Sequence, residues 1–220
     1  MSSAKVVRVP DFKLSPYWQN PTARRTKRAI DFVSALILLA LLSPLFAVVA
    51  IVIRISSRGP IFYRWRVVGK GGRKFVSYKF RSMYQDADAR KNALLERNEM
   101  RGPVFKIAND PRITPIGRVL RKFSIDELPQ LWSVLKGDMS LVGPRPPLQS
   151  EYENFSEWQK LKLQVKPGIT CLWQVGGRNQ IADFNDWVKL DLEYIENWSL
   201  MLDVKILIST IPAVLLGKGR

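Results

Sequence analysis

Histidine is absent from the 220-residue chain, and cysteine occurs once, at Cys171. The lack of histidine excludes Ser-His-Asp and Cys-His catalysis, histidine-ligated zinc and histidine proton shuttles. A single cysteine excludes a disulfide framework within the chain and any cysteine-rich metal site. A nucleophile or general base must therefore come mainly from Asp, Glu, Lys, Tyr, Ser or Thr.

Acidic residues are few. The chain has 19 Asp and Glu against 35 Lys and Arg, a formal net charge of +16. Such a surface predicts an anionic partner, which is a nucleic acid, an anionic lipid or a phosphorylated substrate. With 46% apolar residues and seven Trp, the chain is not a disordered tail. Its length predicts one globular domain, or one domain with an appendage.

The N-terminal segment is basic, and the stretch that follows it lacks charge. Residues 1–28 contain Pro10, Pro16 and Pro21, which predict a loop-like segment. The 22 residues from Phe32 to Ile53 carry no charge. A helix of that length measures about 33 Å, enough to cross a hydrocarbon core of about 30 Å. A single transmembrane helix is the plain interpretation, whereas a signal peptide is disfavoured by the length of the stretch.

Two features favour a re-entrant helix instead. Ser43-Pro44 lies in the middle of the uncharged stretch, where proline kinks a helix and the serine hydroxyl can bind a freed carbonyl. Both flanks are also basic, and no acid occurs between residues 54 and 81. Positive charge marks cytoplasmic flanks, so both ends are expected on the same side of the membrane. The N-terminal flank contributes Arg24, Arg25, Lys27 and Arg28.

Residues 59–82 predict a β-hairpin whose turn contains Gly69, Gly71 and Gly72. A basic hairpin against anionic headgroups is the plain interpretation. In the sharper one, Lys79 and Arg81 share one face of a strand and reach a phosphate together.

Helical patterns follow the hairpin. Residues 84–100 predict a polar helix, and Ile116 to Phe123 predict a basic amphipathic helix that includes Arg121. Residues 183–205 predict an acidic helix, and the apolar residues 206–216 predict an interfacial helix. Asn109-Asp110-Pro111-Arg112 predicts a turn.

The segment Ser124-Ile125-Asp126-Glu127 supports two interpretations. Ser124 and Glu127 fit the S-x-x-E capping box, and Gly137 suits the end of the helix. Adjacent carboxylates in a basic chain without histidine also suit a divalent metal or attack on phosphorus. Gly143-Pro144-Arg145-Pro146-Pro147 is likewise either a rigid linker or a stiff backbone that presents Arg145 to an anion.

Several segments together resemble the monotopic polyprenyl-phosphate phosphoglycosyl transferases, the bacterial sugar transferase family. The resemblance covers about residues 24–217. Its motifs are Lys79-Phe80-Arg81-Ser82-Met83, Asn109-Asp110-Pro111-Arg112-Ile113-Thr114, Asp126-Glu127-Leu128-Pro129-Gln130-Leu131, Lys136 through Pro146, Lys166 through Thr170, and Leu172-Trp173-Gln174-Val175.

The resemblance implies an enzyme that moves a sugar phosphate from a nucleotide diphosphate sugar to polyprenyl phosphate. Asp126 matches the family nucleophile, which forms a phosphosugar-aspartyl intermediate, and Glu127 holds Mg²⁺ or assists proton transfer. Arg121 and Arg145 match arginines near the phosphate site. Lys79, Arg81 and Arg112 are further candidates for phosphate binding. A hexose 1-phosphate from a UDP-sugar, used for an exported polysaccharide, is the expected transfer.

The expected fold is α+β and mainly helical, with a small β-hairpin, catalytic helices and interfacial amphipathic helices. It divides into a basic segment (1–27), a re-entrant membrane helix broken at Ser43-Pro44 (28–55), a catalytic domain (56–205) and an interfacial segment (206–220). The resemblance places it at the bacterial inner membrane, with the catalytic domain on the cytoplasmic face, as a minimal catalytic unit. Expected partners are a UDP-sugar, polyprenyl phosphate and an anionic lipid membrane, with a homodimer left open and no nucleic acid.

Two departures from the family pattern occur near the end of the chain. Cys171 stands where the family usually has glycine, and Gly176 replaces a common serine before Gly177-Arg178. Two rival classes remain open from the residues alone. One is a membrane-tethered nucleic-acid binder, and the other is a non-enzymatic membrane scaffold in which Asp126-Glu127 only caps a helix.

Overall fold

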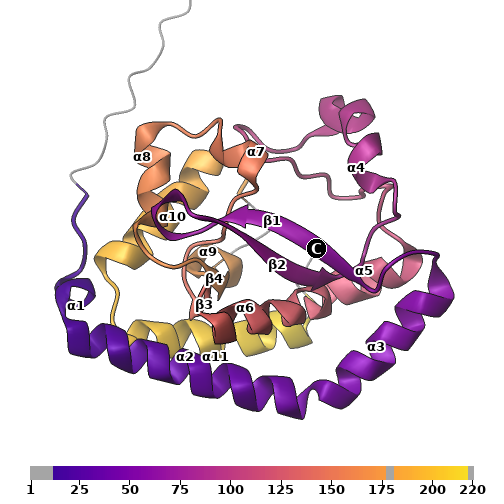
Figure 1. Ribbon diagram of the computed structural model, residues 1–220. Coiled ribbons are helices and arrows are strands. Elements are labelled where there is room, and N and C mark those ends of the chain that lie inside the picture. Colours follow the sequence, from indigo (N-terminus) through magenta and orange to yellow (C-terminus); the bar gives the residue numbers. More distant parts are fainter. Residues whose placement is uncertain (1–11, 177–180, 218–220) are drawn as a thin grey trace, which may run out of the picture.

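A computed structural model describes residues 12–176 and 181–217. The described chain is mainly helical, with two small two-stranded sheets, which confirms the mainly helical α+β class (Figure 1). The start of the basic segment (1–11), Gly177-Arg178 and residues 218–220 lie outside the described residues.

The N-terminal helices begin at prolines rather than ending there. Helix α1 covers Pro16–Gln19 and α2 covers Pro21–Leu41. Proline is tolerated at the first helical position, and the Asn20 side chain accepts hydrogen bonds from the amides of Thr22 and Ala23, at 2.9 and 3.3 Å. The prediction of a loop-like segment through residue 28 is therefore wrong from Pro21 onward. The predicted start of the membrane segment at residue 28 falls inside α2.

The predicted helix break at Ser43-Pro44 is confirmed. Helix α3 covers Ser43–Ser56, and it bends by 59° from α2. The Ser43 hydroxyl donates to the carbonyl of Ala40 at 2.8 Å, as expected for a serine at a proline kink. No single helix in the described ranges is long and apolar enough to cross a membrane, whereas α2 and α3 are when taken together. Figure 1 shows the pair as an open V along the lower edge of the molecule.

The predicted hairpin is also confirmed. Strands β1 (Phe62–Val68) and β2 (Lys74–Phe80) pair antiparallel, and the turn η1 (Lys70–Gly72) joins them. Gly71 and Gly72 have φ values of 65° and 81°, which glycine adopts without steric cost. Trp65 pairs with Ser77, and Tyr63 pairs with Lys79. Because side chains alternate along a strand, Trp65 and Lys79 share one face of the hairpin.

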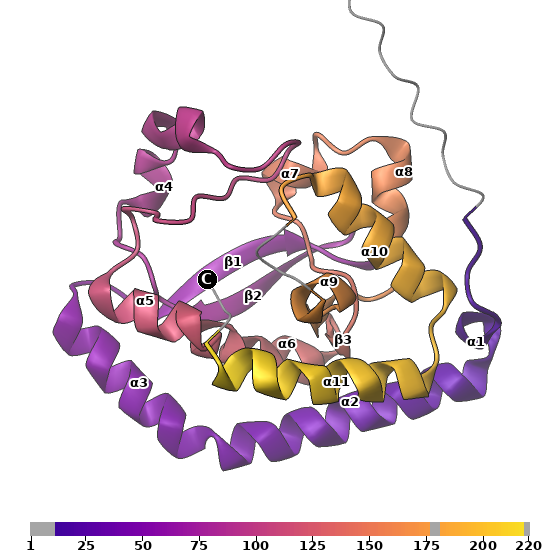
Figure 2. The ribbon, with the colours of Figure 1, turned by 180° about the vertical axis from the view of Figure 1, so that it is seen from behind.

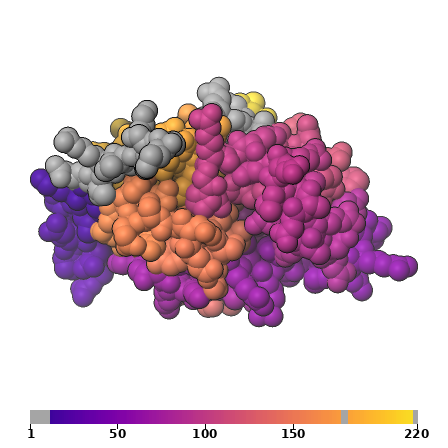
Figure 3. Space-filling view, turned by 90° about the horizontal axis from the view of Figure 1, so that it is seen from above, coloured from indigo at the N-terminus to yellow at the C-terminus, as the bar shows by residue number. Residues whose placement is uncertain are grey.

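The segment after the hairpin differs from the prediction. In place of one polar helix over 84–100, the chain forms a short α4 (Ala87–Arg90) and a 3₁₀ segment η2 (Asn92–Arg97). Ala87 is the one buried residue of these two elements, so no apolar stripe is available to stabilise a longer α-helix. Figure 3 shows the molecule from above, with this magenta segment beside the orange α7 and α8.

The elements that follow bear the central motif. Helix α5 (Pro115–Lys122) confirms the amphipathic prediction, and it leads into the 3₁₀ turn η3 (Ile125–Gln130) and helix α6 (Leu131–Lys136). Gly137, with φ of 86°, ends α6 as predicted.

A second sheet, which the sequence did not predict, joins strands far apart in the chain. Strand β3 (Ser140–Val142) pairs parallel with β4 (Gly168–Thr170). The crossover between them contains α7 (Gln149–Tyr152), α8 (Glu157–Lys160) and η4 (Leu161–Gln164). Helix α9 (Leu172–Val175) then follows β4.

Two helices complete the chain. Helix α10 covers Phe184–Glu196 and α11 covers Leu200–Leu215, so the predicted helix over 183–205 is interrupted and the predicted boundary at residue 206 lies inside α11. The Ser199 hydroxyl accepts from the amide of Leu202 at 3.2 Å and so starts α11. Figure 2 shows α11 running alongside α2.

Buried charges fasten α2 to the rest of the fold. The Lys27 ammonium lies 2.6 Å from the Asp203 carboxylate of α11, which also accepts from the hydroxyl of Tyr194 at 2.7 Å. Asp31, one turn along α2, accepts from the Ser140 hydroxyl of β3 at 2.8 Å. One face of α2, with Lys27, Asp31 and Ala35, is therefore buried against the rest of the fold, so Lys27 is an anchor and not an exposed basic residue.

Candidate active site

The adjacent acids of the central motif lie on the buried turn η3. Asp126 and Glu127 are 6% and 7% exposed. Ser124, just after α5, is the only non-glycine residue of the described ranges with positive φ, at 54°. A left-handed residue at this position commonly terminates a helix. Here it ends α5, and the two acids follow in the next turn, η3. Such a conformation costs about 1 kcal/mol or more in a non-glycine residue and occurs preferentially at functional sites.

The capping-box interpretation of this segment is wrong. A serine that caps a helix has extended backbone angles, and its hydroxyl accepts from the third helical amide. Ser124 is left-handed, and its side chain makes no cap hydrogen bond. The hypothesis of a non-enzymatic membrane scaffold explained Asp126-Glu127 as a helix cap, and the structure shows no such cap.

Glu127 lies between two cations from distant parts of the chain. The ammonium of Lys79, on β2, is 2.7 Å from Glu127 Oε1, and the Arg145 guanidinium is 3.2 Å from the same oxygen. The Trp65 ring of β1 packs against both cations, with its centroid 3.8 Å from Lys79 Nζ and 5.5 Å from Arg145 Cζ. Cation–π attraction and burial hold both side chains in one orientation.

Backbone contacts fix the position of Arg145. The residue follows β3, where the amide of Gly143 donates to Thr170 O and the amide of Gly168 donates to Pro144 O, both at 3.0 Å. A Cβ atom on Gly168 would lie 2.1 Å from the nitrogen of Gly143, so the two segments meet at a distance that only glycine permits. This arrangement favours the interpretation of a stiff backbone that presents Arg145 over that of a linker.

Arg121 approaches the acids from helix α5. Its Nε donates to the Ser82 hydroxyl at 2.9 Å, just beyond β2. Burial lowers the pKa of Arg121, while the charges of Asp126, Asp110 and Glu127 act to raise it. The guanidinium therefore lies in the field of both adjacent acids. An arginine stays charged despite such a shift because its ordinary pKa is above 12.

The two cations around Glu127 differ in how burial acts on them. Burial lowers the pKa of Lys79, and the opposing effects of Glu127 and Asp126 do not restore it. Burial is also the largest effect on Arg145 and acts in the same direction, but Glu127, Cys171 and Glu151 together outweigh it, so the pKa of Arg145 is raised. The site thus contains one cation that can lose its proton in alkaline solution and two arginines that cannot.

Two predicted phosphate ligands contact other groups than Asp126 and Glu127. Arg81 follows β2 and donates to the carbonyl and hydroxyl of Ser57 at 2.7 and 2.9 Å, so it fastens the end of α3. The Arg81 amide still donates to the carbonyl of Ile61 at 2.8 Å, so the hairpin pairing continues to this residue, but its guanidinium contacts Ser57 and not Glu127. Arg112 forms a bidentate pair with Asp110, with Nη2 to Oδ2 at 2.6 Å, inside the predicted turn. Lys79 therefore contacts Glu127 while Arg81 contacts the end of α3, and the charge of Arg112 is compensated by Asp110. Phosphate binding by Arg81 and Arg112 stays a prediction.

The structure adds two residues that sequence reasoning did not select. Trp65 lies beneath both cations, and Ser82 positions Arg121. Ser82 belongs to the recognised Lys79–Met83 motif, so that motif could have indicated it. The strand alternation that unites Trp65 with Lys79 depends on the hairpin register, which the sequence did not define.

Asp126 and Glu127 are the two carboxylates of this site that would hold a divalent cation. Within the described ranges, no group of three or more acidic or cysteine side chains could hold a metal ion. Two carboxylates fit Mg²⁺, because this ion commonly binds proteins through one or two carboxylates and completes its shell with water and substrate phosphates.

Cys171, the first family departure, is a buried residue at the start of α9. It is 2% exposed, and its thiol donates to Gln174 Oε1 at 3.1 Å. Burial raises the pKa of the thiol far above its ordinary range, so it stays protonated and is no nucleophile. The second departure, Gly176, is the last described residue before the gap at 177–180.

Comparison with known proteins gives a consistent family. The profile of the family described as Bacterial sugar transferase matches residues 22–217. The chain is 50% identical over 193 residues to galactosyl transferase CpsE of Streptococcus agalactiae, covering 88% of this chain and 43% of that protein. It is 40% identical over 203 residues to exopolysaccharide production protein ExoY of Sinorhizobium fredii, covering 90% and 89%.

A third relative is named undecaprenyl-phosphate galactose phosphotransferase, from Salmonella typhimurium. It is 42% identical over 209 residues, covering 91% of this chain and 44% of that protein. The chain therefore spans less than half the length of CpsE and of the Salmonella protein, and most of the length of ExoY.

Proposed function

Because the chain belongs to the bacterial sugar transferase family, we propose that it transfers a sugar 1-phosphate from a nucleotide diphosphate sugar to polyprenyl phosphate. The observation that carries this proposal is the buried pair Asp126-Glu127 facing Lys79, Arg121 and Arg145. Three cations around two carboxylates suit a reaction in which phosphate groups enter, react and leave. The relatives named undecaprenyl-phosphate galactose phosphotransferase and exopolysaccharide production protein support this chemistry.

The first step assigns Asp126 as the nucleophile. Its carboxylate oxygen attacks the sugar-bearing phosphorus, and the bond from that phosphorus to the bridging oxygen breaks. The bridging oxygen leaves with its electron pair as part of a nucleoside monophosphate, and an aspartyl phosphosugar remains. A carboxylate nucleophile needs no general base, which suits a chain without histidine.

The second step returns the enzyme to its starting state. An oxygen of polyprenyl phosphate attacks the same phosphorus, and the acyl phosphate bond to Asp126 breaks. The products are polyprenyl diphosphate sugar and the free carboxylate. Both steps place negative charge beside Arg121 and Arg145, whose guanidinium groups stabilise it.

Glu127 has a positioning role in this mechanism. By accepting hydrogen bonds from Lys79 and Arg145, its carboxylate holds both cations beside Asp126 before substrate arrives. Asp126 and Glu127 would also hold Mg²⁺, which, when bound, supplies charge neutralisation for the incoming phosphates.

An apolar surface supports a membrane location. Helices α2, α3 and α11, which run along the lower side of the ribbon in Figure 1, expose many large apolar side chains, and such a concentration marks an interaction surface. Its members include Phe32, Leu36, Leu41, Val48, Ile51, Ile55, Met201, Ile208, Ile211 and Leu215. We infer that the bent pair α2–α3 enters one leaflet and returns, with α11 in the interface of the bacterial inner membrane.

This placement brings the two substrates together. A helix pair that enters and leaves on the cytoplasmic side keeps the globular part at the level of the headgroups. There a lipid phosphate and a soluble nucleotide sugar can both reach Asp126. A UDP-hexose is the proposed donor, and UDP-galactose is the first to test because CpsE and the Salmonella relative are both named for galactose transfer.

The test measures release of the nucleoside monophosphate by the full chain in nanodiscs with Mg²⁺, polyprenyl phosphate and a panel of UDP-sugars. We expect lipid-dependent UMP release with at least one sugar, and a loss of at least about a thousandfold in Asp126→Asn. With radiolabelled sugar and no lipid acceptor, wild type should retain label in the denatured protein and Asp126→Asn should not. Equal turnover in the variant would refute the assignment of Asp126.

A further inference from the structure

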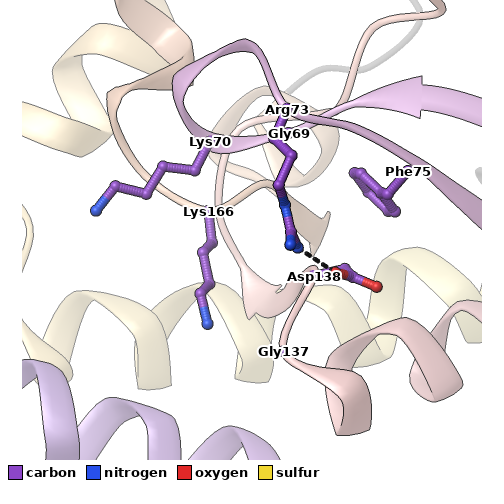
Figure 4. Close-up of a pocket in the computed structure, with 7 residues that line it drawn as sticks. All are labelled: Gly69, Lys70, Arg73, Phe75, Gly137, Asp138 and Lys166. Carbon is purple, nitrogen blue, oxygen red and sulfur yellow. Dashed lines mark hydrogen bonds and ion pairs between the residues drawn. The ribbon is translucent and has the colours of Figure 1, made fainter.

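A second basic pocket lies at the turn end of the hairpin. It has a volume of about 210 Å³, and among its lining residues are Lys70, Arg73, Phe75, Asp138 and Lys166. Since a water occupies about 30 Å³ in the liquid, the space suits a small solvated anion. Figure 4 shows Lys70 and Arg73 extending from the hairpin turn and Lys166 from the loop before β4, with Arg73 directed at Asp138.

This pocket is separate from the site that contains Asp126 and Glu127. Phe75 and Lys79 are four residues apart on β2, which at about 3.3 Å per residue separates the two sites by roughly 13 Å along the strand. None of Asp126, Glu127 and Arg121 lines the pocket. The hairpin therefore has one cationic site near its end and another at its turn.

The pocket contains positive charge that carboxylates do not neutralise. Asp138 is engaged by Arg73 and by Lys136, whose ammonium is 3.5 Å away. Within the described residues, neither Lys70 nor Lys166 makes an ion pair. Burial lowers the pKa of Lys166, and the nearby charges of Arg28 and Lys70 lower it further, although Asp31 and Asp138 oppose them. An anion between these cations would relieve their mutual repulsion.

Helix α2 brings the pocket to the edge of the apolar surface. The Arg28 guanidinium donates to the carbonyls of Val134 and Leu135, both at 2.6 Å, at the end of α6. A Cβ atom on Gly137 would lie 3.3 Å from Arg28 Nη2 and 3.4 Å from Lys166 Nζ, so the two cations flank that residue. Arg28 precedes the uncharged stretch of α2 by four residues, or about 6 Å of helix. The pocket thus lies beside the part of α2 where charged residues give way to the uncharged stretch.

We propose that this pocket binds a phosphate group carried as a monoester or diester, with Lys70 and Lys166 as its ligands. Lysine ammonium groups bind phosphate as point charges, and Arg73 completes the cationic wall. The phosphate comes either from an anionic phospholipid headgroup or from a soluble phosphate compound. A headgroup bound here would fix the height of the globular part above the bilayer.

The test is acetylation footprinting of the full chain, with the rate at each lysine measured by mass spectrometry. The lipid arm compares nanodiscs of phosphatidylcholine with nanodiscs that also contain phosphatidylglycerol. The soluble arm adds millimolar inorganic phosphate to the phosphatidylcholine nanodiscs. We expect Lys70 and Lys166 to react roughly threefold more slowly in one arm. This is the value if a ligand occupies the pocket in about two-thirds of the molecules and blocks acetylation there. Lys74, exposed on the same hairpin, is the internal control.

Protection only with phosphatidylglycerol identifies a lipid headgroup, and protection by inorganic phosphate identifies a soluble ligand. A second measurement titrates the protecting ligand against two double variants. Lys70→Gln with Lys166→Gln should weaken binding about tenfold, whereas Arg66→Gln with Lys74→Gln, which removes the same charge outside the pocket, should not. No protection in either arm, equal protection of Lys74, or equal loss in both variants would overturn the proposal.

Discussion

The ammonium of Lys79 lies 2.7 Å from the carboxylate of Glu127, although 48 residues separate them in the chain. Strand β2 supplies the first residue and turn η3 the second, so this contact joins the hairpin to the turn that follows α5. Both side chains are mostly buried, at 12% and 9% exposure. In such surroundings each charge depends on the other, because an unpaired buried ion is costly.

Glu127→Gln tests this dependence. The change removes the carboxylate that both Lys79 and Arg145 contact, so the buried Lys79 ammonium and the half-buried Arg145 guanidinium lose this counter-charge. We expect the free energy of unfolding to fall by about 3 kcal/mol, the usual cost of removing one partner of a buried pair. Denaturant unfolding of the detergent-solubilised chain measures it. Glu157→Gln, whose ion pair with Lys160 is on the surface, should change stability by less than about 0.5 kcal/mol, and an equal effect of both would contradict the argument.

The alkaline limb of the pH–rate profile should belong to Lys79. Burial lowers the pKa of this lysine, so it loses its proton below the ordinary value of about 10.4. If protonated Lys79 helps bind phosphate, kcat/KM falls as the pH rises through the lowered pKa. Lys79→Arg retains the charge at alkaline pH, and we expect the limb to move upward. A limb that stays in place in this variant would assign it to another group.

The same pKa shift fixes the sign of an effect on stability. Between the lowered pKa and about 10.4, the unfolded chain binds more protons at this lysine than the folded chain does. The contribution of Lys79 to the free energy of unfolding therefore rises with pH in that window. In Lys79→Met the contribution is absent, and the difference in slope between the two proteins measures it.

The bend between α2 and α3 should depend on Pro44. Pro44→Ala restores an amide donor and removes the ring that disfavours a continuous helix. In nanodiscs or cells we expect the pair to straighten toward a spanning helix, which would move the flank after Ile53 to the opposite side. Cysteines introduced at Ser3 and Arg58, in a Cys171→Ser background, report accessibility on each side. Same-side labelling in both proteins would mean that packing, and not proline, sets the bend.

Lys27 should matter more for stability than its neighbours in the sequence. Lys27→Met leaves the Asp203 carboxylate buried without its cation, and we expect a loss of about 3–5 kcal/mol in the free energy of unfolding. Arg24→Met, one turn earlier on α2 and exposed, is the matched control and should change it by less than about 0.5 kcal/mol. Denaturant unfolding distinguishes a buried anchor from a general basic flank.

Gly168→Ala should impair the site from a distance. The added Cβ would lie 2.1 Å from the nitrogen of Gly143, so the segment that carries Arg145 must move. Because misplacement by about 1 Å can cost a hundredfold in rate, we expect kcat/KM to fall by about that factor. Turnover and thermal unfolding should be measured together. Unchanged turnover would show that Arg145 is positioned by its own contacts with Glu127 and Trp65.

Much of the candidate site could be read from the sequence because its chemistry depends on residue types. The lack of histidine left carboxylates as the available nucleophiles, the Ser43-Pro44 pair predicted the helix break, and the ordered motifs carried the family resemblance to Asp126, Glu127 and Arg145. Local rules also predicted the hairpin turn, the amphipathic α5 and the end of α6 at Gly137. Each of these depends on neighbours within a few residues.

Tertiary structure decided what local rules could not. The sequence placed Lys79 and Arg81 on one strand face, but the Lys79 ammonium contacts Glu127 and the Arg81 guanidinium contacts Ser57 at the end of α3. It offered a capping role for Ser124, whereas the fold uses a left-handed turn there to deliver the acids. The sequence grouped Lys27 with the other basic residues of the N-terminal flank, whereas its contact with Asp203, 176 residues away, makes it a buried anchor. Residue type determined which groups could react, and long-range packing determined which of them meet.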